Sequence, residues 1–132
     1  MKRFRKYREN QQVRDSYADV PRILADNFIY PYFVVEGQGI KTEIKSMKGV
    51  YRFSIDQLLV DIQELLILGI SKILLFGVVE DGYKDERGTA AYASDNLISK
   101  GIKAIKEHYP EVWVFTDVCL CEYTSHGHCG LL

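Results

Sequence analysis

Residues 112–130 read VWVFTDVCLCEYTSHGHCG, and this stretch decides the fold. Its first four residues are apolar and β-branched or aromatic, which is typical of a buried strand. Polar and thiol side chains follow at once. Side chains two residues apart on an extended chain point the same way, so continued extended geometry would place Asp117, Cys119 and Cys121 on one face. The stretch therefore predicts a chemical site at the end of a buried strand.

Cys119, Cys121 and Cys129 are all the cysteines of the chain. Three thiolates form a soft ligand set that selects Zn²⁺. Three protein ligands with an open fourth position are typical of a catalytic zinc site, whereas His126 or His128 as a fourth ligand would close a structural one. The residues alone leave both arrangements open.

Other roles suit the cysteines less well. Cysteine is often a small buried apolar residue, but three within eleven residues, interleaved with Glu122 and two histidines, fit a core badly. An odd number of cysteines, with no signal-peptide pattern, argues against a disulfide and for a reducing compartment. For a Cys–His hydrolase dyad, nothing marks one thiol as the nucleophile.

Two upstream stretches, 28–36 (FIYPYFVVE) and 72–79 (KILLFGVV), have the same apolar, β-branched and aromatic character. We expect each to be a strand buried on both faces. Glycines at positions 37 and 39 end the first strand, and a loop with several lysines is expected after them.

Helices are predicted between these strands. One opens at Ser54, with Gln57 at the spacing of a capping box, and ends at Gly69. The next is capped by Ser94 or Asp95 and stops before residue 110, a proline. Their apolar positions recur every three or four residues: Ile55, Leu58, Leu59, Ile62, Leu65 and Leu66 in the first, and Ile98, Ile102, Ile105 and Tyr109 in the second.

Strands that alternate with helices predict an α/β fold with parallel pairing. An open doubly wound sheet would be expected to carry a G-x-G-x-x-G phosphate loop, and none is present. A (β/α)₈ barrel agrees better, because its chemistry lies at the carboxyl ends of the strands, where Asp117, Cys119 and Cys121 fall. Eight such units need more than twice this chain, so the prediction is the N-terminal part of a barrel.

Composition narrows the class further. The 132 residues are 47% hydrophobic and 27% charged with a net charge of -1, which is ordinary for a globular domain and gives no general attraction to nucleic acid or membranes. No run is long and apolar enough to span a bilayer, so we expect a cytoplasmic protein. Residues 1–27 are interpreted as a basic N-terminal arm and residues 28–132 as the first three strands and two helices of the barrel. The arm has too few aromatic residues for nucleic-acid binding.

Several blocks resemble porphobilinogen synthase, also called delta-aminolevulinic acid dehydratase, in its zinc-dependent branch. The cysteine block is the most specific of them. The resembling blocks follow the family order and cover nearly the whole chain: FVVEG (33–37), SMKGVYR (46–52), LFGV (75–78), KDERGTAAY (84–92) and TDVCLCEYTSHGHCG (116–130). Lys48 departs from the family, where many members have proline, and this affects a loop only.

The resemblance implies a lyase that condenses two molecules of 5-aminolevulinate to porphobilinogen with loss of water, in tetrapyrrole (heme) biosynthesis. It implies Cys119, Cys121 and Cys129 as zinc ligands, with the fourth position left to water or substrate. It also implies Asp117 in the substrate pocket and His128 beside the metal. The family assembles as a homo-oligomer, an octamer in the full-length enzyme, and the arm would embrace a neighbouring subunit.

The family's two Schiff-base lysines belong to segments that would follow residue 132. Lys72, Lys84 and Lys100 lie outside those lysine motifs. We therefore expect the 132-residue chain by itself to be inactive. The alternative is a stand-alone zinc-stabilised α/β binding module without catalysis.

Overall fold

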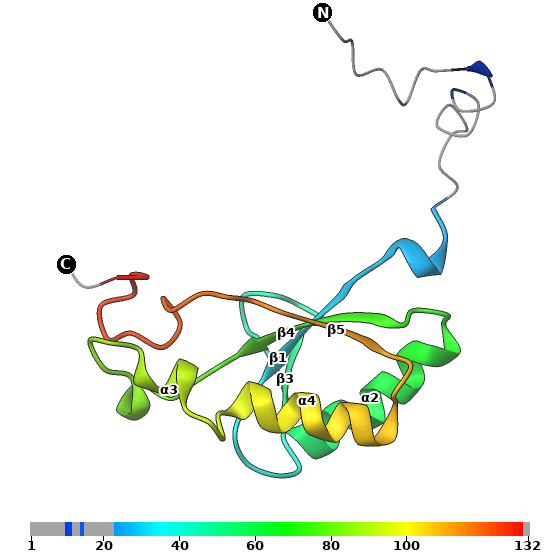
Figure 1. Cartoon of the computed structure of the whole chain (residues 1–132). Coiled ribbons are helices and arrows are strands. Elements are labelled where there is room, and N and C mark those ends of the chain that lie inside the picture. The colour runs from blue at the N-terminus through cyan, green and yellow to red at the C-terminus, as the bar shows by residue number, and fades with distance from the viewer. Residues whose placement is uncertain (1–9, 12–13, 15–22, 131–132) are drawn as a thin grey trace, which may run out of the picture.

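The structure is a computed structural model that describes residues 10–11, 14 and 23–130. Most of the arm predicted for residues 1–27 lies outside the described residues. The described end of this segment contains a short 3-10 helix, η2 (Ala25–Asn27), which leads into the sheet (Figure 1). The boundary between an arm and a barrel portion at residues 27 and 28 stays a prediction.

Within the described residues the strands form one mixed sheet with the order β2-β3-β1-β4-β5. The strands are β1 (Tyr30–Val34), β2 (Lys41–Glu43), β3 (Tyr51–Phe53), β4 (Lys72–Gly77) and β5 (Trp113–Thr116). The connecting helices are α2 (Ile55–Ile67), η3 (Asp81–Tyr83), α3 (Thr89–Tyr92) and α4 (Leu97–His108). Strands β1, β4 and β5 pair in parallel. The predicted order of strand, helix, strand, helix, strand is therefore confirmed for the parallel part of the sheet.

The segment after β1, which was expected to be a loop, contains strands β2 and β3. They pair antiparallel, and β3 also pairs in parallel with the end of β1, where Val34 lies opposite Phe53. Each has three residues, and every side chain of β2 is exposed. Strands this short lack the apolar run that predicts a buried strand. The backbone of β3 pairs with the edge of β1, and β2 pairs in turn with β3.

Helix α2 begins after Ser54 as predicted, but the capping box with Gln57 does not form. The Ser54 hydroxyl donates to the carboxylate of Asp56 at 2.6 Å and accepts from the N–H of Ile40 at 2.8 Å. It therefore ties the start of the helix to the segment before β2. Gly69, with a φ of +81°, ends the helix as predicted. The buried face consists of Leu58, Ile62 and Leu65, with Ile55, Leu59 and Leu66 partly buried beside them.

Helix α4 is capped by Asn96 and not by Ser94 or Asp95. The side-chain oxygen of Asn96 accepts from the N–H of Ser99 at 2.8 Å, and its amide nitrogen donates to the carbonyl of Ala93 at 2.9 Å. An amide carries both a donor and an acceptor, so it satisfies the preceding turn and the helix together. The predicted positions Ile98, Ile102, Ile105 and Tyr109 all pack on the core. Among the described residues no helix combines the length and apolarity needed to cross a membrane.

Both long helices lie on one side of the sheet (Figure 1), and the other side is left open by the described residues. Val112 is fully buried on the helix side, whereas Trp113 and Phe115 point the opposite way and are 64% and 39% exposed. The prediction of a fully buried third strand is therefore wrong. Strand β5 is at the edge of the sheet, so only alternate side chains of this segment reach the helices.

The core of α2 gives a direct test of this packing. Ile62 has no exposed surface, while Ile67 on the same helix is 80% exposed. We expect Ile62→Ala to lower the free energy of unfolding by about 2–5 kcal/mol, since it removes buried methyl groups and leaves a cavity. The same change at Ile67 should stay within about 0.5 kcal/mol. Equal effects in denaturant titrations would contradict the assigned faces of α2.

Candidate metal centre

The chain turns soon after it leaves β5. The N–H groups of Tyr123 and Thr124 both donate to the carbonyl of Leu120, at 2.9 and 3.1 Å. The extended geometry expected for residues 117–121 is therefore interrupted. A turn, rather than strand alternation, brings the side chain of Cys121 toward Cys129.

The three thiols meet at one point. The sulfur of Cys129 lies 2.8 Å from that of Cys121 and 3.3 Å from that of Cys119. All three sulfurs are within 4.8 Å of one another. Cys119 and Cys121 are partly buried, and Cys129 is exposed. The segment 119–129, called the cysteine loop below, thus gathers the three predicted ligands on one accessible side.

The three sulfur donors and their clustering suit a zinc ion. Zinc binds thiolates at about 2.3 Å with tetrahedral angles, which separates the sulfurs by about 3.8 Å. The sulfurs here are closer than this, at 2.8 and 3.3 Å in the two pairs with Cys129, so coordination would move them apart by about 0.5 to 1 Å. An all-sulfur set also favours zinc over magnesium or calcium.

The thiols share their protons unequally. Hydrogen bonds from Cys121 and Cys119 lower the pKa of Cys129 to about 7. The pKa of Cys121 is raised to about 12, chiefly because its thiol is hydrogen-bonded to Cys129. The cluster thus stabilises one thiolate through two thiol donors. A divalent cation would replace these protons, because metal-bound thiols are deprotonated.

Neither neighbouring histidine joins the sulfurs. Among the described residues, the ligand atoms that cluster within 4.8 Å are the three thiols, without His126 or His128. The ring of His126 instead lies with its Nε2 3.1 Å from the carbonyl of Glu86, and its Nδ1 accepts from the N–H of His128 at 3.3 Å. The two imidazoles stack, with centroids 5.8 Å apart. The geometry favours a site with an open fourth position.

Two carboxyl groups lie near the thiols, Asp117 before the cysteine loop and Glu122 within it. Asp117 is exposed directly after β5, at the carboxyl end of the strand. Burial raises the pKa of Glu122, and the negative charge of Asp117 raises it further. The raised pKa makes Glu122 easier to protonate than an ordinary glutamate, and carboxyl groups near a site are common proton donors and acceptors.

The cysteine loop is anchored on the end of β4. Tyr123 is 8% exposed, and its hydroxyl lies where a side chain at Gly77 would begin. Thr124 is 4% exposed, and its hydroxyl donates to the carbonyl of His128 at 3.0 Å. Sequence reasoning did not single out Tyr123 or Thr124, because their contacts join segments far apart in the chain. The glycine at the end of β4 is the one local signal of a close approach.

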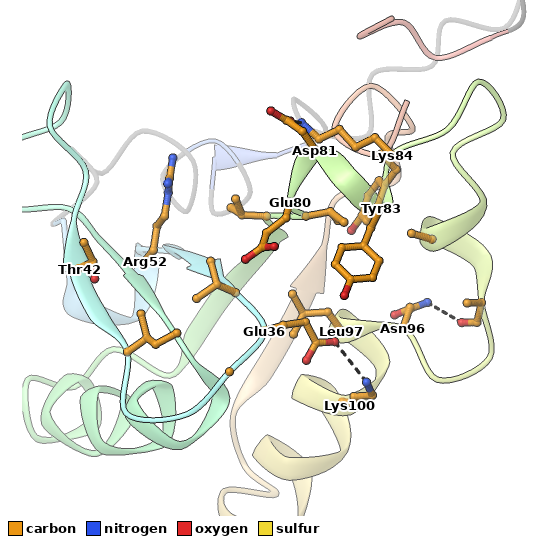
Figure 2. A pocket seen from close by; sticks show the side chains of 18 residues that line it. Glu36, Thr42, Arg52, Glu80, Asp81, Tyr83, Lys84, Asn96, Leu97 and Lys100 are labelled. Atoms are coloured by element: carbon orange, nitrogen blue, oxygen red, sulfur yellow. Dashed lines mark hydrogen bonds and ion pairs between the residues drawn. The ribbon is translucent and has the colours of Figure 1, made fainter. Parts of the chain in front are cut away.

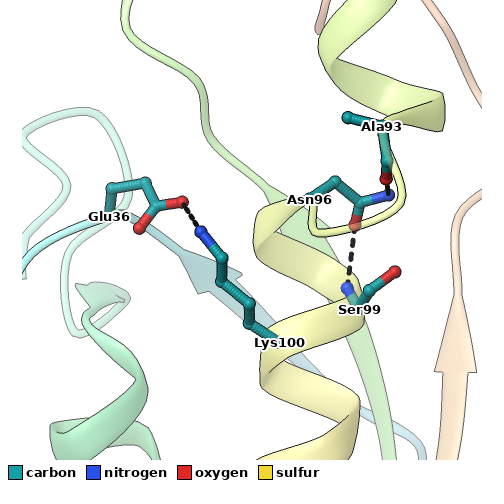
Figure 3. Close-up of polar contacts among 5 residues, drawn as sticks. All are labelled: Glu36, Ala93, Asn96, Ser99 and Lys100. Atoms are coloured by element: carbon teal, nitrogen blue, oxygen red, sulfur yellow. Dashed lines mark hydrogen bonds and ion pairs between the residues drawn. The ribbon is translucent and has the colours of Figure 1, made fainter.

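A cavity of about 1100 Å³ opens at the carboxyl ends of β1 and β4, next to this anchor (Figure 2). Tyr123 forms part of its wall, but the three cysteines do not. On its floor Lys100 pairs with Glu36 at 3.2 Å, close to the capping contacts of Asn96 (Figure 3). The charged residues that line it are Glu36, Arg52, Glu80, Asp81, Lys84 and Lys100. These residues lie in β3, follow β1 or β4, or belong to the first turn of α4, and the sequence reasoning gave none of them a role.

Known proteins of one family match this chain over its whole length. The family model described as delta-aminolevulinic acid dehydratase matches residues 1–132. The chain is 43% identical over 132 residues to the delta-aminolevulinic acid dehydratase of Ruminiclostridium josui, covering 100% of this chain and 63% of that protein. It is 44% identical over 130 residues to the one from Bacillus subtilis (strain 168), covering 98% of this chain and 39% of that protein.

A solved structure gives the same result for the fold. The crystal structure of delta-aminolevulinic acid dehydratase (porphobilinogen synthase) from Toxoplasma gondii ME49, in complex with the reaction product porphobilinogen, superposes with a TM-score of 0.82 at 33% identity. The match covers 100% of this chain and 37% of that one. The predicted α/β class and the assignment to part of that fold are confirmed. The chain, which spans between about a third and two thirds of the relatives compared, belongs to the delta-aminolevulinic acid dehydratase family.

Proposed function

We propose that this chain is the metal-bearing N-terminal part of a porphobilinogen synthase, a hydro-lyase that condenses two molecules of 5-aminolevulinate to porphobilinogen in tetrapyrrole (heme) biosynthesis. The observation that carries the proposal is the cluster of three thiols within 4.8 Å, at the carboxyl end of a parallel strand in a chain of this family. The relative from Toxoplasma gondii, which was solved with porphobilinogen, supports the substrate class.

In this proposal Cys119, Cys121 and Cys129 hold one Zn²⁺ and leave a fourth position open for water or substrate. Bound there, zinc supplies a Lewis acid that can polarise a substrate carbonyl group or hold its amino group. The accessible side of the cluster leaves room for a small substrate. Soft thiolate donors also keep the site selective against the hard cations of the cell.

The neighbouring polar groups take the remaining roles. Asp117 orients the substrate and accepts or returns a proton, for which its exposed position at the strand end is suited. Glu122 supplies the second, more easily protonated carboxyl group. His128 lies beside the metal, where its exposed imidazole can contact the substrate. The roles of Asp117 and His128 follow the family resemblance, and the role of Glu122 follows its raised pKa.

The lysines of the cavity are poor candidates for Schiff-base formation. Lys84 pairs with Asp81 at 2.8 Å and Lys100 with Glu36 at 3.2 Å, so the nitrogen of each is already held by a carboxylate and would have to leave that contact to attack a substrate carbonyl. The two lysines that carry this chemistry therefore belong to other segments of the protein in this proposal.

The assembly and location are also part of the proposal. A cytoplasmic homo-oligomer, an octamer as in the family, would use residues 1–27 as an arm around a neighbouring subunit. Trp113 and Phe115 on the open side of the sheet offer apolar surface that further protein would cover.

The metal site can be tested by binding. We expect about one Zn²⁺ per chain, with an affinity that falls as the pH is lowered, because the thiols must lose their protons to bind. The protons to be displaced include that of Cys121, whose pKa is raised to about 12 without metal. Chelator competition at several pH values measures this dependence.

Replacing the three cysteines by serine should abolish Zn²⁺ binding, whereas His108→Ala should not alter it, since His108 bonds to Ala104 on α4. Full occupancy in the triple variant would refute the assignment.

The activity is tested in the natural protein that contains this chain. We expect Asp117→Asn to lower kcat for porphobilinogen formation by about 100-fold or more, because a neutral amide cannot exchange the proton. Asp95→Asn is a matched control on the exposed turn before α4 and should retain full kcat. A normal kcat for Asp117→Asn would remove this residue from the proposed mechanism. If the unmodified protein forms no porphobilinogen from 5-aminolevulinate, the proposed function itself is wrong.

A further inference from the structure

We propose that Asp85 is a positioning residue for the metal centre, because it shapes the turn on which the cysteine loop rests. This inference deepens the proposed function and rests on it, since it assumes that the three thiols bind Zn²⁺. Asp85 is not a ligand, and its carboxylate is exposed. Its effect would pass through the backbone of the two loops.

The carboxylate of Asp85 organises residues 85–89. One of its oxygens accepts from the N–H of Arg87 at 2.9 Å and from the N–H of Thr89 at 3.0 Å. The segment closed by these two hydrogen bonds includes Gly88, which adopts the left-handed conformation with a φ of +64°. Hydrogen bonding to Thr89 lowers the pKa of Asp85, so the charged form is the one that holds the turn. Without the carboxylate, two backbone donors would lose their common acceptor.

The turn then supports the cysteine loop along its middle. The backbone of Asp85 forms an isolated parallel bridge with Thr124, and its carbonyl accepts from the N–H of Ser125 at 2.9 Å. The ring nitrogen of His126 reaches the carbonyl of Glu86 at 3.1 Å. In Figure 1 the segment before α3 and the orange to red C-terminal segment accordingly run side by side.

Gly88 adds a further contact between this turn and the cysteine loop. A side chain at this position would meet Thr124, Tyr123 and Leu120 at 3.4 to 3.6 Å, which means that the backbone of Gly88 faces these three residues closely. The shape of the turn thus sets where the middle of the cysteine loop can lie. A change in the turn would be transmitted to the loop by direct contact.

Thr124 connects the turn at Asp85 to the segments that carry the cysteine ligands. Its buried hydroxyl donates to the carbonyl of His128 at 3.0 Å and lies 3.4 Å from the carbonyl of Cys121. It therefore joins the backbone at Cys121 to the backbone just before Cys129, the pair with the closest sulfurs. A loop held in this way has its ligands in place before the metal arrives, and groups outside the first coordination shell commonly change metal affinity by about 10-fold to 100-fold.

The test compares Asp85→Ala, Asp85→Asn and Asp81→Ala. Zn²⁺ affinity is measured by chelator competition, and the thiolate-to-metal absorption band of the Co²⁺-loaded chain reports the number of sulfur ligands. Asp85→Ala should weaken Zn²⁺ binding by about 10-fold to 100-fold and reduce the Co²⁺ band. Asp85→Asn, which keeps an acceptor oxygen, should recover part of the affinity. Asp81→Ala is the matched control from the same segment and should bind as the unmodified chain, because the carboxylate of Asp81 pairs with Lys84.

A second pair of variants covers the case in which Asp85→Ala does not fold. Thr124→Val removes the hydroxyl at nearly constant volume and should weaken Zn²⁺ binding. Thr124→Ser keeps the hydroxyl and should bind Zn²⁺ more tightly than the valine variant.

The thermal unfolding temperature of the metal-free chains should be nearly the same for Asp85→Ala and Asp81→Ala, which separates an effect on ligand position from an effect on general stability. Equal Zn²⁺ affinity of these two folded variants would overturn the inference and leave the metal site standing. Failure of the unmodified chain to bind Zn²⁺ would overturn both.

Discussion

The contact between Tyr123 and Gly77 is the constraint on which the position of the metal centre depends. Strand β4 ends with a residue that has no side chain, and the hydroxyl of Tyr123 occupies the space that a side chain would take. Because Tyr123 lies between Cys121 and Cys129 in the chain, this contact fixes the cysteine loop to the carboxyl end of β4, an inner strand of the sheet. The loop itself contains few apolar residues and could not hold its position by its own packing.

The parallel sheet explains why the chemical groups collect where they do. Strands β1, β4 and β5 run in the same direction, so the segments that follow them meet at one edge. The charged cavity follows β1 and β4, and the cysteine loop follows β5. Two features of different chemistry, a mixed-charge cavity and a soft metal site, thus lie beside each other with Tyr123 in the wall between them. In the proposed function, this neighbourhood would place a small charged substrate beside the metal.

The sequence predicted those parts of the fold whose signals are local. Apolar runs marked β1 and β4, and the periodicity of α2 identified its buried face, including Ile62. Three cysteines close together in sequence have few other uses, so they indicated the cluster that the structure shows, while their role as metal ligands stays a prediction. Contacts between distant segments were not predictable in the same way. Ser54 looked like a helix cap, yet its hydroxyl bonds to Ile40 and Asp56. Strand β3 forms on the edge of β1, and β2 forms in turn on β3. Trp113 was expected to be buried because it lies in an apolar run, but it is 64% exposed. An apolar run carries no information about whether its strand lies inside the sheet or, like β5, at its edge.

The central claim is that the three thiols of the cysteine loop bind zinc together and leave one position open. X-ray absorption spectroscopy at the zinc edge of the zinc-loaded chain measures this directly. We expect three sulfur neighbours at about 2.3 Å and one lighter oxygen or nitrogen neighbour at about 2.0 Å. A zinc shell of nitrogen and oxygen alone, with no sulfur, would contradict the account.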